Sequence, residues 1–303
     1  MEFLRLLEEI RTGWLNGIML AVTYLGSEII FLAVALIFFW CVDKTRGYYL
    51  MSVGFVGTIL NQFLKLYCRI PRPWVQDPQF TIVEEARAGA DGYSFPSGHT
   101  QSAVGTYGSI AYTSRNRWVQ VLCVAVAALV AFSRMYLGVH TPMDVGVSVV
   151  IGIILIFALR PLFYKESGKY IPWMLGFMTA LAVGFLLYVE FCPFPEETDG
   201  ENLASGMKNA YTLLGALLGM VVVYIVDEKW LHFPIKAIWW AQLLKLVLGI
   251  ALVLGIKTVL TQPMTALFGF YWGRLVRYFL TVVVAGCLWP LTFSWFAKLG
   301  NKS

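Results

Sequence analysis

Three clusters of polar residues interrupt an otherwise apolar sequence, and their residue types suit the chemistry of phosphate. In chain order they are Lys65 with Arg72-Pro73, then Pro96-Ser97-Gly98-His99, then Ser133-Arg134 with His140 and Asp144. An arginine side chain presents a planar fork of N–H donors that matches phosphate oxygens. Lys65, Arg72 and Arg134 together supply three cations, so the clusters predict a site for a phosphoryl group.

The second cluster adds backbone donors to this site. Ser97, Gly98 and His99 stand at the start of a predicted helix, where free N–H groups and the positive end of the helix dipole attract an anion. Gly98 has no side chain and lets the backbone approach a ligand closely. We therefore expect the helix start and the three cations to form a cradle for phosphate.

Two histidines of the clusters suit nucleophilic and acid–base work. His140 and Asp144 are four residues apart and would share one face of a helix. A carboxylate in that place can hold one ring nitrogen and leave the other nucleophilic. His99 is a second imidazole, suited to proton transfer near neutral pH. The third histidine, His232, falls on a different predicted loop and is interpreted as an ordinary solvated residue.

Each feature has an ordinary explanation when it is taken alone. Lys65 could extend from the end of a span toward the membrane surface, and Arg72 could be a solvated charge between two prolines. Arg134 could anchor a helix at the interface, and Asp144 could cap one. These explanations do not account for all three spacings together, nor for two of the three histidines lying within the clusters.

The rest of the sequence indicates that these residues are held by membrane helices. Of the 303 residues, 58% are hydrophobic and 14% are charged, whereas a soluble domain is about half apolar and about a quarter charged. Spans need roughly 20 mainly apolar residues. We predict an all-α, polytopic transmembrane helix bundle of about nine spans, with an amphipathic interfacial helix over 1–13. The spans are 17–42, 48–67, 97–114, 117–137, 140–160, 171–191, 209–226, 235–256 and 275–297.

Two segments differ from ordinary spans. The span 97–114 is rich in Ser, Thr and Gln, so it should lie inside the bundle, away from lipid. The stretch 259–272 is short, and we expect it to be interfacial or re-entrant, with a tenth span as the alternative. No linker or repeat is evident. The chain is therefore expected to form one membrane domain, with a core that carries the three clusters at about 17–165 and additional transmembrane helices at about 171–297.

Loop charges predict the orientation. The loops 42–47, 115–117, 160–170, 227–237 and 298–303 carry eleven Lys and Arg against four acids. Because short basic loops stay in the cytoplasm, the N-terminus and the three clusters are expected on the extracytoplasmic side. The outer loops contain no N-x-S/T sequon, which favours a bacterial cytoplasmic membrane. The basic residues are spread over short loops, so no nucleic-acid partner is expected. The five cysteines show no pairing pattern.

The clusters are similar to the three signature motifs of the type 2 phosphatidic acid phosphatase superfamily: K-x6-R-P, P-S-G-H and S-R-x5-H-x3-D. Every defining position is present, and the motif-bearing region covers 48–160. The string 133–141 resembles that of sphingosine-phosphate phosphatases most, and the nine-span layout resembles glucose-6-phosphatase. The four spans after residue 165 depart from the usual six-span bacterial members, so the resemblance does not identify the substrate.

The resemblance implies a residue-by-residue mechanism. His140 would attack phosphorus and form a phosphohistidine, and Asp144 would orient His140. His99 would protonate the leaving oxygen and then activate water. Lys65, Arg72, Ser97, Gly98 and Arg134 would bind the phosphoryl oxygens. Three fixed cations would take the place of Mg²⁺, so no metal and no cofactor are expected.

The expected substrate is a lipid monophosphate or diphosphate that enters from the membrane. Phosphatidate, polyprenyl diphosphate, phosphatidylglycerophosphate and a sphingoid-base phosphate all remain open. One alternative is a phosphotransferase that passes phosphate from His140 to a lipid acceptor. Another is a lipid-phosphate transporter that retains the pocket, although binding alone would not need His99, His140 and Asp144. The sequence does not determine the oligomeric state.

Overall fold

The computed structural model describes residues 1–164, 168–195 and 198–299, and within these ranges every regular element is a helix. The chain divides into two compact units. Unit 1 comprises 1–32, 53–161 and 193–206, and unit 2 comprises 33–52, 162–192 and 207–303. The all-α membrane fold is confirmed. The expectation of a single membrane domain stays a prediction, and its core boundary at 165, like Lys165, Glu166 and Lys302, lies outside the described residues.

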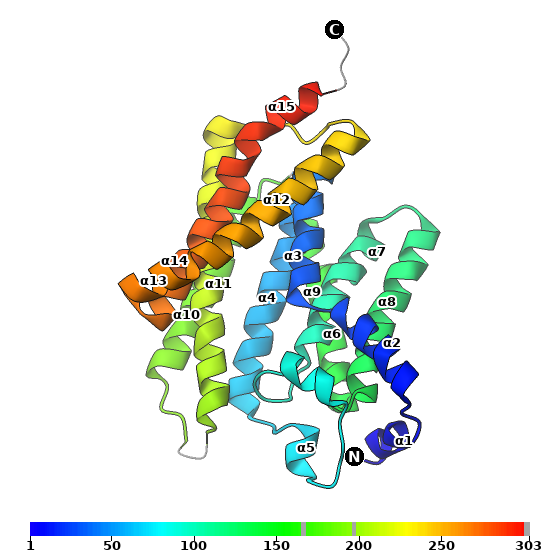
Figure 1. The fold of residues 1–303 in the computed structure, drawn as a ribbon. Coiled ribbons are helices and arrows are strands. Elements are labelled where there is room, and N and C mark those ends of the chain that lie inside the picture. Colours follow the sequence, from blue (N-terminus) through cyan, green and yellow to red (C-terminus); the bar gives the residue numbers. More distant parts are fainter. Residues whose placement is uncertain (165–167, 196–197, 300–303) are drawn as a thin grey trace. The chain divides into compact units, whose positions relative to one another are not determined.

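The first part of the chain contains twelve of the helices (Figure 1). Their bounds are α1 Glu2–Glu9, α2 Gly13–Tyr24, α3 Glu28–Ile37, η1 Phe38–Val42, α4 Lys44–Cys68, α5 Pro73–Gln76, η2 Glu84–Gly89, α6 Gly98–Ala103, η3 Val104–Gly108, α7 Ser109–Thr113, α8 Arg117–Tyr136 and α9 Pro142–Tyr164. Within unit 1, α8 packs against α2 and against the α6–α7 segment. Unit 1 contains all three polar clusters.

The second part continues with helices that follow the three polar clusters in sequence. Their bounds are α10 Ile171–Phe191, α11 Gly200–Val226, η4 Asp227–Leu231, α12 Trp239–Val259, α13 Thr261–Phe268, α14 Phe270–Val283, η5 Val284–Leu288, η6 Trp289–Thr292 and α15 Phe293–Lys298. In unit 2, the backbones of α11 and α14 approach each other closely at Gly215. A Cβ at this position would lie 2.2 Å from the Leu275 carbonyl oxygen.

Every predicted span coincides with one helix or with consecutive helices, but the count of nine is not confirmed. Six helices of the described residues are long and apolar enough to cross a membrane, or seven if the pair 13–24 and 28–42, bent by 46°, is one span. The α4 helix and the α6–α7 segment fall below that standard. The physical reasons differ: α4 carries Asn61, Gln62 and Lys65, which lower its apolar content, whereas the α6–α7 segment covers only 98–113 and is too short.

The polar span lies inside unit 1, as its composition predicts. Thr100, Gln101, Thr106 and Ser109 are all buried. A π-helical turn, η3, interrupts the segment between α6 and α7. Such turns are rare and often occur near functional sites.

The stretch 259–272 does not form a span of its own. It contains α13, which has eight residues and therefore extends only about 12 Å. The chain reverses at Gly269, where φ is +77°. Gly273 then lets α14 approach α13 closely, because a Cβ there would lie 2.5 Å from the Met264 carbonyl oxygen.

The N-terminal helix is amphipathic, as predicted, but its apolar face is covered by protein. Leu4 and Leu7 are buried against Phe80 in unit 1. On the polar face, Arg5 forms an ion pair of 2.5 Å with Asp77. Leu4 and Leu7 therefore dock α1 on the loop that follows α5, whereas Ile10, the third apolar residue of the pattern, is 54% exposed; the interfacial position of the helix stays a prediction.

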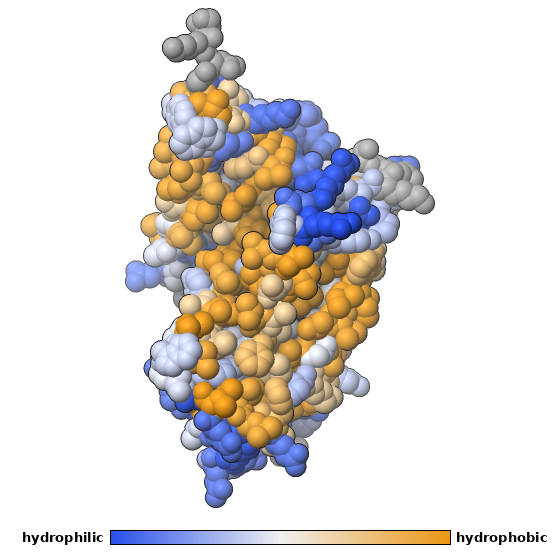
Figure 2. Space-filling model, turned by 90° about the vertical axis from the view of Figure 1, so that its right-hand side faces the viewer, coloured by the Kyte–Doolittle hydropathy of each residue, from blue (hydrophilic) through white to orange (hydrophobic). Residues whose placement is uncertain are grey.

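The helix sides carry the apolar surface that a lipid environment requires. On the face drawn in Figure 2, hydrophobic residues cover most of the surface and hydrophilic residues gather in separate patches. In α8, for example, Trp118, Val121 and Leu122 are all strongly exposed. All five cysteines are free.

Candidate active site

The three predicted cations lie together in unit 1, although they come from separate elements. Lys65 is in the last turn of α4, Arg72 is the N-cap residue of α5, and Arg134 is in the last turn of α8. All three are buried, with exposed fractions of 5%, 5% and 1%. Two of them lie near helix C-termini, where the helix dipole favours a cation.

A short segment, Gly89–Ser94, holds all three cations through its backbone carbonyl groups. Arg134 donates to Gly89 at 3.3 Å, and Arg72 donates to Asp91 at 2.9 Å and to Gly92 at 3.0 Å. The Lys65 ammonium donates to the Tyr93 carbonyl oxygen. We call this segment the carbonyl collar. It fixes the cations without neutralising them, because a carbonyl has no net charge.

The contact between Arg72 and His140 determines where the proton of the imidazole lies. Arg72 Nη1 and His140 Nε2 are 2.9 Å apart. A guanidinium has donors and no acceptor, so Nε2 must be the unprotonated nitrogen and the proton must be on Nδ1. His140 therefore presents the lone pair of Nε2 to the cation cluster.

Asp144 approaches the other ring nitrogen, but by a different route from the predicted one. His140 lies outside α9, which begins at Pro142, so the two residues do not share a helical face. Instead, Thr141 and Asp144 form a reciprocal cap: Asp144 Oδ2 accepts from the Thr141 N–H at 2.8 Å, and Thr141 Oγ1 accepts from the Asp144 N–H at 3.3 Å. This cap places Asp144 Oδ2 3.5 Å from His140 Nδ1.

Ser94, which the sequence motifs do not include, also positions Asp144. Its hydroxyl donates to Asp144 Oδ2 at 2.6 Å, and the residue is fully buried. The collar therefore contacts both the cations and the carboxylate. No motif includes Ser94, so the sequence analysis missed it. The feature that could have drawn attention to this segment is the pair Gly89 and Gly92 just before the P-S-G-H cluster.

The helix start is confirmed at the predicted place. Ser97 is the N-cap of α6, and its hydroxyl accepts from the Thr100 N–H at 3.4 Å. The Ser97 N–H itself donates to the Asp144 carbonyl oxygen at 3.1 Å. The N–H groups of Gly98 and His99 are the next ones in the first turn, and a helix has no partners of its own for them.

His99 follows Gly98 in the same turn and is partly exposed. The collar passes close to its ring, because a Cβ at Gly89 would lie 3.6 Å from His99 Cε1. The two histidines therefore differ in environment: His140 is buried behind Arg72, and His99 is more accessible.

The charge balance of the site is strongly positive. Among the buried residues that the structure describes in unit 1, three are cations and one, Asp144, is a carboxylate. Burial lowers the pKa of Arg72 to about 10, which leaves it charged at neutral pH. Burial, and then the charges of Arg72 and Arg134, lower the pKa of His140 well below its usual value. Excess buried charge is costly without a counter-ion, so the site suits an anion.

The described residues contain no group of three or more His, Cys, Asp or Glu that could hold a metal ion. All eight residues predicted for the site are in unit 1, and the collar joins their three polar clusters. Their catalytic and binding roles stay predictions.

Fold and site together define a helical membrane protein with a buried cluster of three cations in contact with a buried histidine. The PAP2 superfamily profile matches residues 46–168, and that of the PAP2 superfamily phosphatase transmembrane extension matches 211–302. Phosphatidylglycerophosphatase B of Bacillus subtilis is 33% identical over 167 residues, which cover 50% of this chain and 76% of that protein. The chain belongs to the PAP2 superfamily and is a lipid phosphatase of the membrane.

Other relatives act on different lipids, according to their names. Undecaprenyl-diphosphatase BcrC of Bacillus subtilis is 33% identical over 53% of this chain and 79% of its own length. Sphingosine-1-phosphate phosphatase 1 of Mus musculus is 25% identical over 79% of this chain and 58% of its own length. The crystal structure of a transmembrane PAP2-type phosphatidylglycerolphosphate phosphatase from Bacillus subtilis matches with a TM-score of 0.47 and 28% identity, over 55% of this chain and 85% of that one.

Proposed function

We propose that this protein hydrolyses lipid phosphate monoesters or diphosphates through a phosphohistidine at His140, on the extracytoplasmic side of a bacterial cytoplasmic membrane. The observation that carries the proposal is the excess of buried positive charge beside an imidazole whose Nε2 is unprotonated. A phosphate dianion would supply the missing negative charge. It would also replace Arg72 in front of the Nε2 lone pair.

In the first step, the Nε2 lone pair attacks phosphorus and the bond from phosphorus to the leaving oxygen breaks. His99 gives its proton to that oxygen, so the alcohol departs neutral. Asp144 and the Nδ1 proton stabilise the positive charge that develops on the ring of His140. Lys65, Arg72, Arg134 and the N–H groups of the α6 start hold the phosphoryl oxygens throughout.

In the second step, His99 takes a proton from water as the water oxygen attacks phosphorus. The bond to His140 Nε2 breaks, and inorganic phosphate is released. The three cations supply the charge stabilisation for which many phosphoryl-transfer sites need Mg²⁺. The mechanism therefore requires no metal ion.

The decisive experiment measures free phosphate released by the purified protein from a panel of lipid phosphates with excess chelator present. The panel contains phosphatidate, phosphatidylglycerophosphate, undecaprenyl diphosphate and a sphingoid-base phosphate. We expect release from at least one of them, inhibition by vanadate, and no activity in His140→Ala. Activity that disappears with chelator and returns with Mg²⁺ would refute the mechanism. Transfer to an acceptor lipid without free phosphate would identify a phosphotransferase instead.

A further inference from the structure

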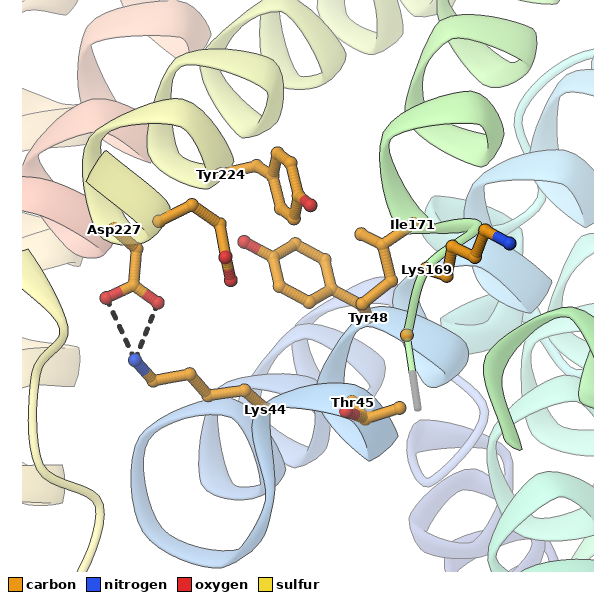
Figure 3. A pocket seen from close by; sticks show the side chains of 9 residues that line it. Lys44, Thr45, Tyr48, Lys169, Ile171, Tyr224 and Asp227 are labelled. Atoms are coloured by element: carbon orange, nitrogen blue, oxygen red, sulfur yellow. Dashed lines mark hydrogen bonds and ion pairs between the residues drawn. The ribbon is translucent and has the colours of Figure 1, made fainter. Parts of the chain in front are cut away.

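Unit 2 contains a cavity of about 230 Å³, and none of the residues that line it belongs to the three polar clusters (Figure 3). It lies where α4 begins, where the chain enters α10, and where α11 passes into η4. Its walls include Lys44, Tyr48, Lys169, Tyr224, Asp227 and Glu228. The loops at these helix ends are the Lys- and Arg-rich ones that we predict to be cytoplasmic.

Two lysines and two carboxylates line the cavity, and one of the carboxylates, Glu228, has no partner among the described residues. Lys44 donates to both oxygens of Asp227, at 2.8 and 2.6 Å (Figure 3). Asp227 also accepts from the Phe233 N–H at 3.2 Å. In contrast, Glu228 forms no hydrogen bond and no ion pair with any residue that the structure describes. The two lysines and two carboxylates give a net charge near zero, which suits a zwitterion better than an anion.

Tyr48 provides an independent indication of a ligand. Its side chain lines the cavity, the residue is only 4% exposed, and its hydroxyl has no hydrogen-bond partner among the described residues. The ring of Tyr224 meets that of Tyr48 edge to face, with centroids 5.9 Å apart (Figure 3). A buried hydroxyl without a partner is unfavourable, so a ligand with a hydrogen-bond donor would stabilise the cavity.

Two tryptophans place the cavity at the level of lipid headgroups. Trp173 follows the lining residue Ile171 in α10, and Trp230 follows Glu228 in η4; they are 77% and 70% exposed. Exposed tryptophans concentrate at the boundary between hydrocarbon and water. A ligand at this depth is most simply supplied by the membrane itself.

We propose that this cavity binds the primary ammonium group of a zwitterionic phospholipid headgroup. The Glu228 carboxylate and the Tyr48 hydroxyl accept its N–H donors, and the Tyr224 ring lies beside the cation. A quaternary ammonium has no N–H and could not satisfy these two acceptors. The cavity is smaller than the roughly 300–1,000 Å³ of pockets for drug-sized ligands, so it fits a headgroup and excludes the acyl chains.

The test compares phosphatidylethanolamine with phosphatidylcholine of the same acyl chains, using native mass spectrometry of the delipidated full chain. We expect at least about tenfold tighter binding of phosphatidylethanolamine, and a loss of about tenfold in Glu228→Gln, as for removal of a hydrogen bond to a charged group. Tyr48→Phe should weaken binding about fivefold by removing a neutral hydrogen bond. Glu201→Gln, an exposed acid outside the cavity, is the matched control and should bind as the unsubstituted protein does.

The same measurement can overturn the proposal. Equal binding of the two lipids, or unchanged binding in a Glu228→Gln protein with an unaltered thermal midpoint, would show that the cavity does not recognise a primary ammonium. Soluble phosphoethanolamine should compete with the lipid, because the headgroup alone is recognised. Binding of soluble phosphoethanolamine without any preference between the lipids would refute the lipid as the source of the ligand.

Discussion

At the scale of single residues, the site depends on the position of one proton. Arg72 has no acceptor, so its 2.9 Å contact requires an unprotonated His140 Nε2. The 3.5 Å separation of Nδ1 from Asp144 is long for a hydrogen bond in the absence of substrate. Catalytic hydrogen bonds of this kind often tighten only when the substrate is bound. The first prediction tests the different duties of His140 and His99, and the second tests the protonation of His140.

The first prediction separates the histidines by leaving group. His140→Ala should abolish turnover of every substrate, because His140 makes the bond to phosphorus. His99→Ala should cost about 10²–10⁴-fold in kcat/KM on an alkyl lipid monophosphate, whose alkoxide needs a proton in order to leave. On an aryl phosphate the loss should be clearly smaller, since a nitrophenolate leaves unaided. Equal losses on the two substrates would assign His99 to phosphate binding alone.

The second prediction concerns pH. The folded pKa of His140 lies well below its usual value of about 6.5. Above about pH 6.5, the usual pKa of histidine, the His140 ring is neutral in both the folded and the unfolded chain. Below it the unfolded chain takes up a proton that the folded site resists, so folding stability falls. The loss is at most about 1.4 kcal/mol per pH unit until the folded pKa is reached.

The measurement compares thermal midpoints of the unsubstituted protein and His140→Gln in phosphate-free detergent solution, at about pH 8 and about pH 5.5. Gln cannot titrate, so the variant should gain in stability relative to the unsubstituted protein on acidification. A difference between the two proteins that stays constant with pH would contradict a lowered pKa.

At the scale of elements, the carbonyl collar is the part that organises the site. Gly89–Ser94 contacts the ends of α4 and α8, the cap of α5 and the first turn of α9. It can do so because Gly92 has φ of +70°, a conformation that side chains with a Cβ rarely adopt. The start of α6 contributes the backbone donors beside it.

The third prediction follows from this conformation. Gly92→Ala should weaken vanadate binding about tenfold, because a left-handed non-glycine residue costs roughly 1–2 kcal/mol and a shift of the collar would displace Arg72 and Lys65. Inhibition constants for vanadate measure the effect. Gly146→Ala in α9 is the control, since its Cβ would meet nothing within 4 Å. Equal inhibition constants for the two variants would show that the collar does not position the cations.

At the scale of the whole molecule, the orientation in the membrane determines which leaflet supplies the substrate. The fourth prediction is that a cysteine at Gln79, in a protein without native cysteines, reacts with an impermeant thiol reagent on intact cells. The same cysteine at Asn116 should stay unlabelled until the membrane is permeabilised. Both positions are exposed, so accessibility within the protein does not distinguish them. Labelling at Asn116 alone would invert the topology.

The sequence by itself was sufficient for the family, the all-helical membrane fold and the eight candidate site residues. These depend on local properties: apolar composition over about 20 residues, and fixed spacings of Lys, Arg, His and Asp around helix ends. The helix start at Ser97 follows from the same local chemistry, because an N-cap needs only its own first turn.

Only the tertiary structure decided how those residues meet. Spacing placed His140 and Asp144 on one helical face, whereas a cap at the start of α9 brings them together. The helical spacing of Leu4 and Leu7 is the same whether lipid or Phe80 covers them, so the sequence does not distinguish these two environments. The collar carbonyls belong to every residue type and leave no signature in the sequence. Their role arises from a positive φ at Gly92 and from contacts such as that between Gly89 and Arg134, which are 45 positions apart. Long-range backbone contacts of this kind depend on the packed fold, and spacing along the chain does not encode them.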